Sequence, residues 1–91
     1  MDTSLRQSLK AQAHYLKPVV LLGAKGLTQA VSAETHIALQ SHELIKVKIS
    51  GAEKEDRLKM AMELCLQLKA ELVQMIGSIA IIYRKNEGKR K

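Results

Sequence analysis

The sequence is poor in aromatic residues: its 91 residues include two tyrosines, Tyr15 and Tyr83, and no tryptophan or phenylalanine. So few rings cannot supply the aromatic surface on which many single-strand binders stack bases. The single cysteine, Cys65, excludes an internal disulfide and a cysteine-based metal site. No apolar run reaches the ~18 residues of a membrane span, and the N-terminus has no signal-peptide core. We therefore expect a cytoplasmic protein.

What the sequence does contain is enough apolar surface for one core and an excess of positive charge. Apolar residues make up 46% of the chain, which suits a single domain with a modest core. Lysine and arginine number 15 against 9 acidic residues, for a formal net charge of +6. The positive charge is concentrated in residues 1–26, 44–52 and 72–91. This segregation points to a polyanionic partner.

Hydrophobic periodicity predicts elements in the order α-β-α-β-α-β-β. The run from Val19 to Leu22 is continuously apolar, so we expect a strand buried on both faces. Residues 44–50 alternate, which leaves Lys46 and Lys48 on a wet face. The expected ranges are 4–16, 19–22, 27–41, 44–50, 53–69, 72–76 and 79–84.

Each predicted helix has an apolar face, and the first two have candidate N-caps in Ser4 and Thr28. The predicted faces are Leu5, Leu9, Ala13 and Leu16 in the first helix, Leu27, Ala30, Val31, Ile37 and Ala38 in the second, and Leu58, Ala61, Met62, Cys65 and Leu68 in the third.

The order of elements predicts an α/β fold, a compact two-layer domain with a four-stranded mixed sheet. Two β-α-β units imply parallel pairing with right-handed crossovers. If both crossovers progress the same way across the sheet, both helices lie on one face. The opposite face would carry Lys46 and Lys48. Gly77 and Ser78 favour a tight hairpin that returns the last strand antiparallel. The order of the strands within the sheet does not follow from the sequence.

A glycine pair at Gly23 and Gly26 encloses Ala24 and Lys25, just before the helix expected to start at Thr28. Missing side chains let a phosphate approach the backbone, and a helix N-terminus offers unpaired N–H groups to an anion. KH domains hold the RNA backbone with a GxxG loop of this kind. The alternative is a strand-to-helix turn in which the glycines only supply positive φ angles.

Three stretches together resemble the CRM domain, the chloroplast RNA splicing and ribosome maturation domain that occurs alone in bacterial YhbY proteins. They are Leu16 to Thr28, with the sequence LKPVVLLGAKGLT; His42 to Ile49, with HELIKVKI; and Ile76 to Arg84, with IGSIAIIYR. The resemblance implies a fold like the C-terminal domain of translation initiation factor 3. It further implies binding to ribosomal RNA in precursors of the large ribosomal subunit, through the loop Gly23–Gly26.

Several basic residues could add RNA contacts, and each has an ordinary alternative. Lys46 and Lys48 could bind phosphates or merely solvate a strand and block edge pairing. Arg84 could bind phosphate or pair with a carboxylate such as Glu71, and Tyr83 could stack on a base or fill a sheet edge. Three further candidates lie in or next to the first predicted helix and could instead form an ordinary charged helix surface. They are Arg6, Lys10 and Lys17.

Other functions fit the inventory less well. No catalytic triad or metal-ligand spacing can be assembled from the three histidines and the acidic residues. Cys65 lies on an apolar stripe, where a buried, unreactive thiol is expected. We therefore expect a non-enzyme without metal, cofactor or small-molecule substrate. A module that docks on an acidic protein stays open as an alternative. We expect a monomer with one RNA-binding domain over residues 1–84 and a basic, flexible tail over residues 85–91.

Overall fold

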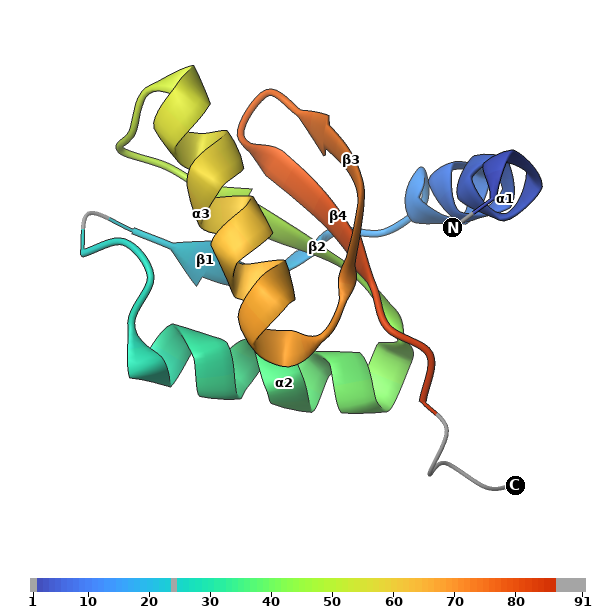
Figure 1. Ribbon diagram of the computed structural model, residues 1–91, viewed down its shortest axis with the longest axis horizontal. Coiled ribbons are helices and arrows are strands. Elements are labelled where there is room, and N and C mark those ends of the chain that lie inside the picture. The colour runs from blue at the N-terminus through green and yellow to red at the C-terminus, as the bar shows by residue number, and fades with distance from the viewer. Residues whose placement is uncertain (1, 24, 87–91) are drawn as a thin grey trace.

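The helices and strands follow one another in the order that the sequence predicts (Figure 1). The computed structural model describes residues 2–23 and 25–86. An α/β fold with a four-stranded mixed sheet is confirmed. Its elements are α1 (Thr3–Ala13), β1 (Pro18–Leu22), α2 (Gln29–His42), β2 (Leu44–Ile49), α3 (Lys54–Leu68), β3 (Glu71–Ile76) and β4 (Ile79–Tyr83).

The strands lie in the order β1-β2-β4-β3. β1 and β2 pair in parallel, as predicted for the first β-α-β unit, and the other two pairs are antiparallel. β2 and β3 also run parallel, as the second unit predicts, but they do not pair directly, because β4 lies between them. This order places β4, whose residues 80–82 are all buried, inside the sheet. β3 carries Glu71 and Gln74 and takes the edge, where polar side chains reach water.

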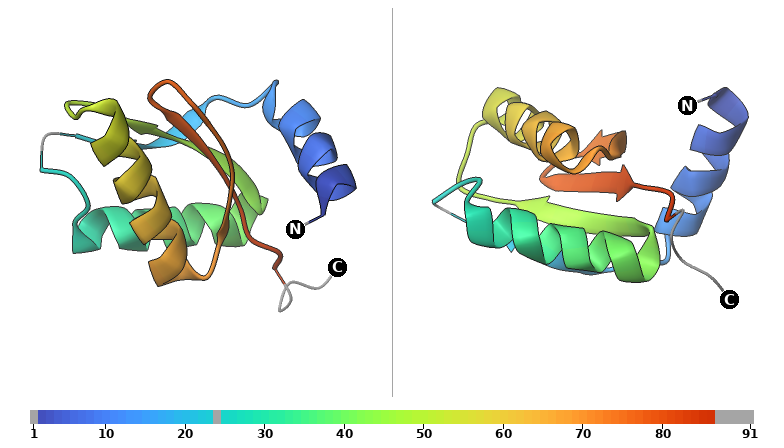
Figure 2. Two further views of the ribbon diagram at one scale, coloured as in Figure 1. Left: turned by 45° about the horizontal axis from the view of Figure 1, so that its top comes forward. Right: turned by 60° about the horizontal axis from the view of Figure 1, so that its bottom comes forward.

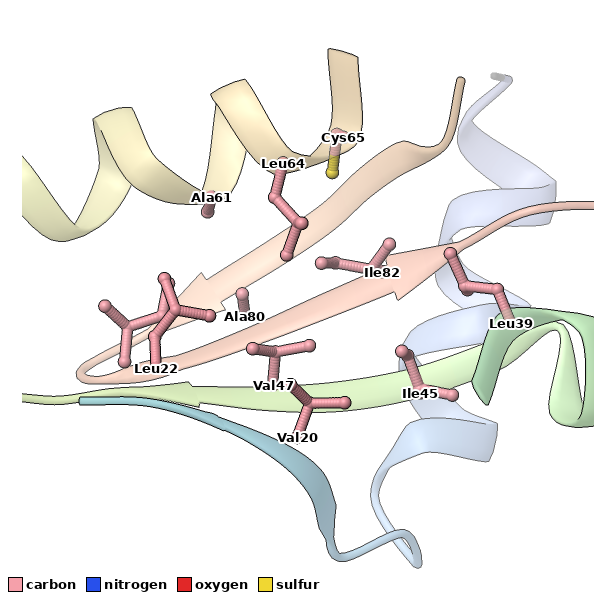
Figure 3. Close-up of a cluster of buried hydrophobic side chains, with 11 residues drawn as sticks. Val20, Leu22, Leu39, Ile45, Val47, Ala61, Leu64, Cys65, Ala80 and Ile82 are labelled. Carbon is pink, nitrogen blue, oxygen red and sulfur yellow. The ribbon is translucent and has the colours of Figure 1, made fainter. Parts of the chain in front are cut away.

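The main core lies between the sheet and the two helices α2 and α3, which cover the same face. Figure 3 shows side chains from both helices and from the strands pointing toward one another. The alternation predicted for residues 44–50 is confirmed, because Ile45, Val47 and Ile49 all enter this core. The buried cluster consists of Val20, Leu22, Leu39, Ile45, Val47, Ile49, Ala61, Leu64, Cys65, Ala80 and Ile82.

The buried side of α2 differs from the predicted face. Thr35 and Leu39 are buried, whereas Ala30 is exposed and Ile37 is 64% exposed. Residues two apart lie on nearly opposite sides of a helix, so Leu39 and Ile37 cannot both face the sheet. A search for apolar residues does not find Thr35, because threonine is polar. Its hydroxyl donates to the Val31 carbonyl at 2.7 Å, and this hydrogen bond allows the side chain to be buried.

The predicted face of α3 is also only partly correct. Ala61 and Cys65 are buried as expected, but Leu64 is buried as well, whereas Leu58 and Met62 are exposed. The helix carries more apolar residues than one face can bury. Counting apolar residues therefore does not fix the rotation of the helix about its axis.

The first helix, α1, packs on the face of the sheet opposite α2 and α3. Its Leu9 and Ala13 form a second buried cluster with Leu44, Val73 and Ile81. In Figure 1 and Figure 2, α1 lies at the end of the molecule remote from the loop between β1 and α2. The sheet is thus fully covered on one face and only partly covered on the other.

The boundaries of α1 differ from the prediction at both ends. Asp2, not Ser4, is the N-cap, because the Leu5 N–H donates to Asp2 Oδ1 at 2.7 Å. The helix ends at Ala13, and Leu16 lies beyond it in the connection to β1. Leu5 and Leu16, expected on the apolar face, are both exposed.

The prediction that β1 is buried on both faces is wrong. Val20 and Leu22 enter the main core, but Val19 is exposed and Leu21 is 59% exposed. α1 packs chiefly against β2, β3 and β4, and the outward side chains Val19 and Leu21 of the edge strand β1 stay exposed. Apolar side chains consequently face solvent next to the glycine loop.

Candidate nucleic-acid interface

The glycine loop joins the end of β1 to the start of α2. The Gly26 N–H donates to the Gly23 carbonyl at 2.9 Å, which closes a tight turn around Lys25. Gly26 has a φ of +73°, a left-handed conformation that favours glycine. A Cβ added at Gly23 would meet nothing within 4 Å. Gly26 therefore serves the fold, whereas the fold has no steric need for a glycine at Gly23. Ala24 lies outside the described residues.

Thr28 caps α2 as predicted. Its Oγ1 accepts a hydrogen bond from the Val31 N–H at 3.2 Å, and its backbone is extended. The Thr28 hydroxyl is therefore bonded to one of the N–H groups in the first turn of α2 that have no partner within the helix. The cap fixes where α2 begins and so directs the positive end of the helix toward the loop. Thr28 thus acts as the cap of α2, and its hydroxyl is not a free side-chain donor beside the loop.

Lysines follow the paired strands β1 and β2 from the loop to the connection with α1. Lys48 is exposed, and its Cα partner in β1 is Leu21, two residues before the loop. Lys46 is half-buried, and its Nζ donates to the Leu16 carbonyl at 3.1 Å. Lys17 is exposed and immediately precedes Pro18, which is the Cα partner of Lys46. The structure therefore distributes four lysines along β1, β2 and the adjoining loop; we call Lys17, Lys25, Lys46 and Lys48 the lysine strip.

Two predicted contacts, Arg6 and Arg84, lie away from the strip and bond within the fold. Arg6 Nη1 donates to the Leu72 carbonyl at 3.2 Å and to the Val73 carbonyl, where the register of β3 shifts. β3 is the sheet edge opposite β1. Arg6 thus satisfies backbone oxygens that an irregular strand leaves outside the ladder.

Arg84 holds together the helix ends at the far end of the sheet. Its Nη1 donates to the Leu68 carbonyl at 3.1 Å, and its Nη2 donates to the Gln40 Oε1 at 3.0 Å and the His36 carbonyl at 3.4 Å. The expected alternative was Glu71; the bonds formed are to carbonyl and amide oxygens instead. Leu68 is the last residue of α3, whose carbonyls need partners outside the helix.

The remaining predicted residues take intermediate positions. Lys10 is half-buried on α1 and lines a shallow depression with His14 and Tyr15. Tyr83 is half-buried and packs against the cluster under α1. Asn86 is bonded to the end of α2, with its N–H donating to Glu43 Oε2 at 3.0 Å. The tail cations Lys89, Arg90 and Lys91 lie outside the described residues.

A group of carboxylates beside the loop, on the side of α3, was not predicted from the sequence. The Ser50 N–H donates to the Leu22 carbonyl at 3.0 Å, so the connection from β2 to α3 adjoins the start of the loop. This connection leads to the exposed carboxylates Glu53, Glu55 and Asp56. These charges repel phosphate on that side. The lysines on the outer side of β1 and β2 therefore lie away from these carboxylates.

No arrangement for metal or nucleophilic chemistry accompanies the strip. Residues 2–23 and 25–86 contain no group of three or more His, Cys, Asp or Glu side chains that could hold a metal ion. Cys65 is buried, and burial, with a smaller contribution from Glu71, raises the pKa of its thiol to about 12. The thiol therefore stays protonated at neutral pH. No helix of this part of the chain has the length and hydropathy needed to cross a bilayer.

Comparison with known proteins relates this geometry to a family. The model of the CRS1 / YhbY (CRM) domain matches residues 1–84. A "probable RNA-binding protein" of Pseudomonas aeruginosa is 48% identical over 81 residues, covering 89% of this chain and 78% of the relative. An "RNA-binding protein" of Haemophilus influenzae is 46% identical, covering 96% and 88%. The solution structure of a hypothetical protein from Staphylococcus aureus superposes with a TM-score of 0.84 at 29% identity, over 93% and 88% of the two chains.

Proposed function

Because the chain belongs to the CRS1 / YhbY (CRM) domain family, we propose that it is a non-catalytic RNA-binding protein. Its partner in this proposal is ribosomal RNA in precursors of the large ribosomal subunit, whose assembly it assists in the cytoplasm as a monomer. Relatives from two bacteria are named RNA-binding proteins, which supports the RNA partner. The ribosomal partner is inferred from the resemblance of the loop, the second strand and the hairpin to this family.

The observation that carries the proposal is the open backbone at Gly23. Glycine there has no steric function in the fold, yet its missing side chain leaves room for a phosphate beside Lys25 and the N-terminus of α2. The lysine strip continues this surface along β1 and β2. Contacts of this kind recognise the RNA backbone and its shape, which suits a chain with two aromatic residues.

The proposal predicts a strong dependence of RNA affinity on salt. Four phosphate contacts, one for each cation of the lysine strip, give a slope of about −3 in a plot of log affinity against log salt concentration. Affinity for transcribed large-subunit ribosomal RNA would be measured by filter binding over a salt series. A slope near zero contradicts phosphate contacts by the strip.

The loop is tested by Lys25→Glu with Lys59→Glu as the matched control. Both lysines are exposed and both changes reverse one charge, but Lys59 lies on α3 beside Met62 and Leu66, outside the strip. We expect Lys25→Glu to weaken binding to ribosomal RNA at least tenfold and Lys59→Glu to weaken it far less. If both variants lose the same RNA affinity, Lys25 contributes only through the net charge of the protein and not through its place in the loop. Competition by an acidic protein fragment, but not by structured RNA, would favour a protein partner instead.

A further inference from the structure

One row of side chains crosses the whole sheet on the face that α1 leaves open. In the strand register, Leu21 of β1 pairs with Lys48 of β2, Lys48 pairs with Ile79 of β4, and Ile79 pairs with Ile76 of β3. Because the partners in each pair project to the same side, the four side chains form one continuous line. We call Leu21, Lys48, Ile79 and Ile76 the outer row.

The outer row is apolar except for one cation, and it is open to solvent. Leu21 is 59% exposed and Ile76 is 53% exposed; Lys48 is exposed and Ile79 is half-buried. α1 covers the same face farther along the strands, where it buries Leu44, Val73 and Ile81. A helix thus covers one half of this face and leaves the other half uncovered, although three of the four residues in the outer row are apolar.

The charges around the row favour an anionic occupant. β1, β2 and β4 carry no carboxylate. Glu71, the carboxylate of β3, pairs with Tyr83 at the opposite end of the strands from Ile76. The carboxylates at the start of α3 belong to the helix layer on the other face of the sheet. The row also runs directly into the glycine loop, which begins two residues after Leu21.

We propose that the outer row receives unpaired nucleotides of the RNA whose backbone the glycine loop binds. Their bases pack against the aliphatic side chains of Leu21, Ile79 and Ile76, and a phosphate meets the Lys48 ammonium. A paired helix presents phosphates to the loop but keeps its base faces stacked, so the apolar row selects RNA with an unpaired stretch. Adjacent strands lie about 4.8 Å apart, so the row spans about 14 Å.

This inference rests on the proposed function, and the test separates the two. The variants are Leu21→Gln and Ile76→Gln, with Ile37→Gln as the matched control. Ile37 is an equally exposed isoleucine on α2, in the helix layer beyond the main core. All three positions are exposed, so the variants should fold, and their melting temperatures should match that of the parent protein.

Two probes distinguish base contacts from phosphate contacts: a single-stranded oligoadenylate and inorganic polyphosphate of similar length. We expect Leu21→Gln and Ile76→Gln each to weaken oligoadenylate binding by about fivefold, because each variant loses the burial of aliphatic surface against a base. Neither change should alter polyphosphate binding. Ile37→Gln should alter neither, and Lys25→Glu should weaken both.

The outcomes are separable. If Lys25→Glu weakens oligoadenylate binding while Ile76→Gln and Leu21→Gln behave like Ile37→Gln, the row does not bind bases and the loop still binds RNA. If the parent protein does not bind transcribed large-subunit ribosomal RNA at low salt, the proposed function itself fails. Photocrosslinking with thiouridine-substituted RNA gives a second readout, with crosslinks expected in peptides that contain Leu21 or Ile76. Crosslinks confined to the helix layer would overturn the inference.

Discussion

The two glycines of the loop are predicted to respond in opposite ways to the same change, the addition of one methyl group. Gly26→Ala forces an L-residue into the left-handed conformation, since φ is +73°. This conformation costs roughly 1–2 kcal/mol, and the lower entropy of the unfolded chain returns about 0.4–1 kcal/mol. The new Cβ would lie 3.6 Å from the Met60 sulfur, an ordinary contact that adds no clash. The net destabilisation is about 1 kcal/mol.

At Gly23 the same methyl group has no folding cost. The φ angle of Gly23 is not in the left-handed region, and the Cβ would meet nothing within 4 Å. Gly23→Ala should therefore leave stability unchanged or raise it by up to about 1 kcal/mol. Its effect should appear in binding, because the methyl group occupies the space through which a phosphate approaches the backbone.

Thermal unfolding followed by circular dichroism and filter binding to ribosomal RNA test both halves of this prediction. Gly26→Ala should lower the melting temperature by about 4–8 °C, the shift that 1 kcal/mol produces in a domain of this size. Gly23→Ala should melt with the parent protein and bind RNA several-fold more weakly. Full RNA affinity in the Gly23 variant would refute the argument, because the loop would then be a turn alone.

Three further predictions concern the residues that support the site. Thr28→Ala should destabilise the protein by about 1 kcal/mol through loss of the α2 cap, measured by urea unfolding. Arg6→Met should cost about 1–3 kcal/mol in the same assay, because two carbonyls of β3 lose their donor, and a stable variant with weakened RNA binding would contradict this structural role. Cys65 should resist alkylation at pH 8 until the protein unfolds. Its thiol pKa is raised from 9.0 to about 12, so its contribution to stability is intact below pH 9 and declines between pH 9 and 12.

The local sequence pattern is sufficient to predict the helices and strands. It does not predict the strand order or the buried faces of the helices, because these depend on packing between distant segments. The alternation around Lys46 and Lys48, the turn after β3 and the cap at Thr28 are all encoded within a few residues. The position of β4 between β2 and β3 depends on which strand is best buried on both faces. That comparison involves the whole chain. The rotation of α2 and α3 has the same origin, because both helices carry spare apolar residues such as Ile37 and Met62.

The candidate site follows the same division. The loop and its lysine could be found from sequence because glycine spacing and a helix start are local signals. The separation of Arg6 and Arg84 from the lysine strip could not, since their partners are backbone carbonyls brought close by the tertiary fold. The outer row was hidden for a related reason. A continuous apolar run such as β1 looks buried on both faces until the position of α1 is known.

The most direct test of the account is the sedimentation of the protein in a low-salt sucrose gradient of cell lysate. The protein should sediment with precursors of the large ribosomal subunit, the Lys25→Glu variant should stay at the top, and the Lys59→Glu control should follow the parent protein. Finding the parent protein only at the top of the gradient would contradict the ribosomal role. Finding the Lys25 variant together with the precursors would contradict the assignment of RNA binding to the glycine loop.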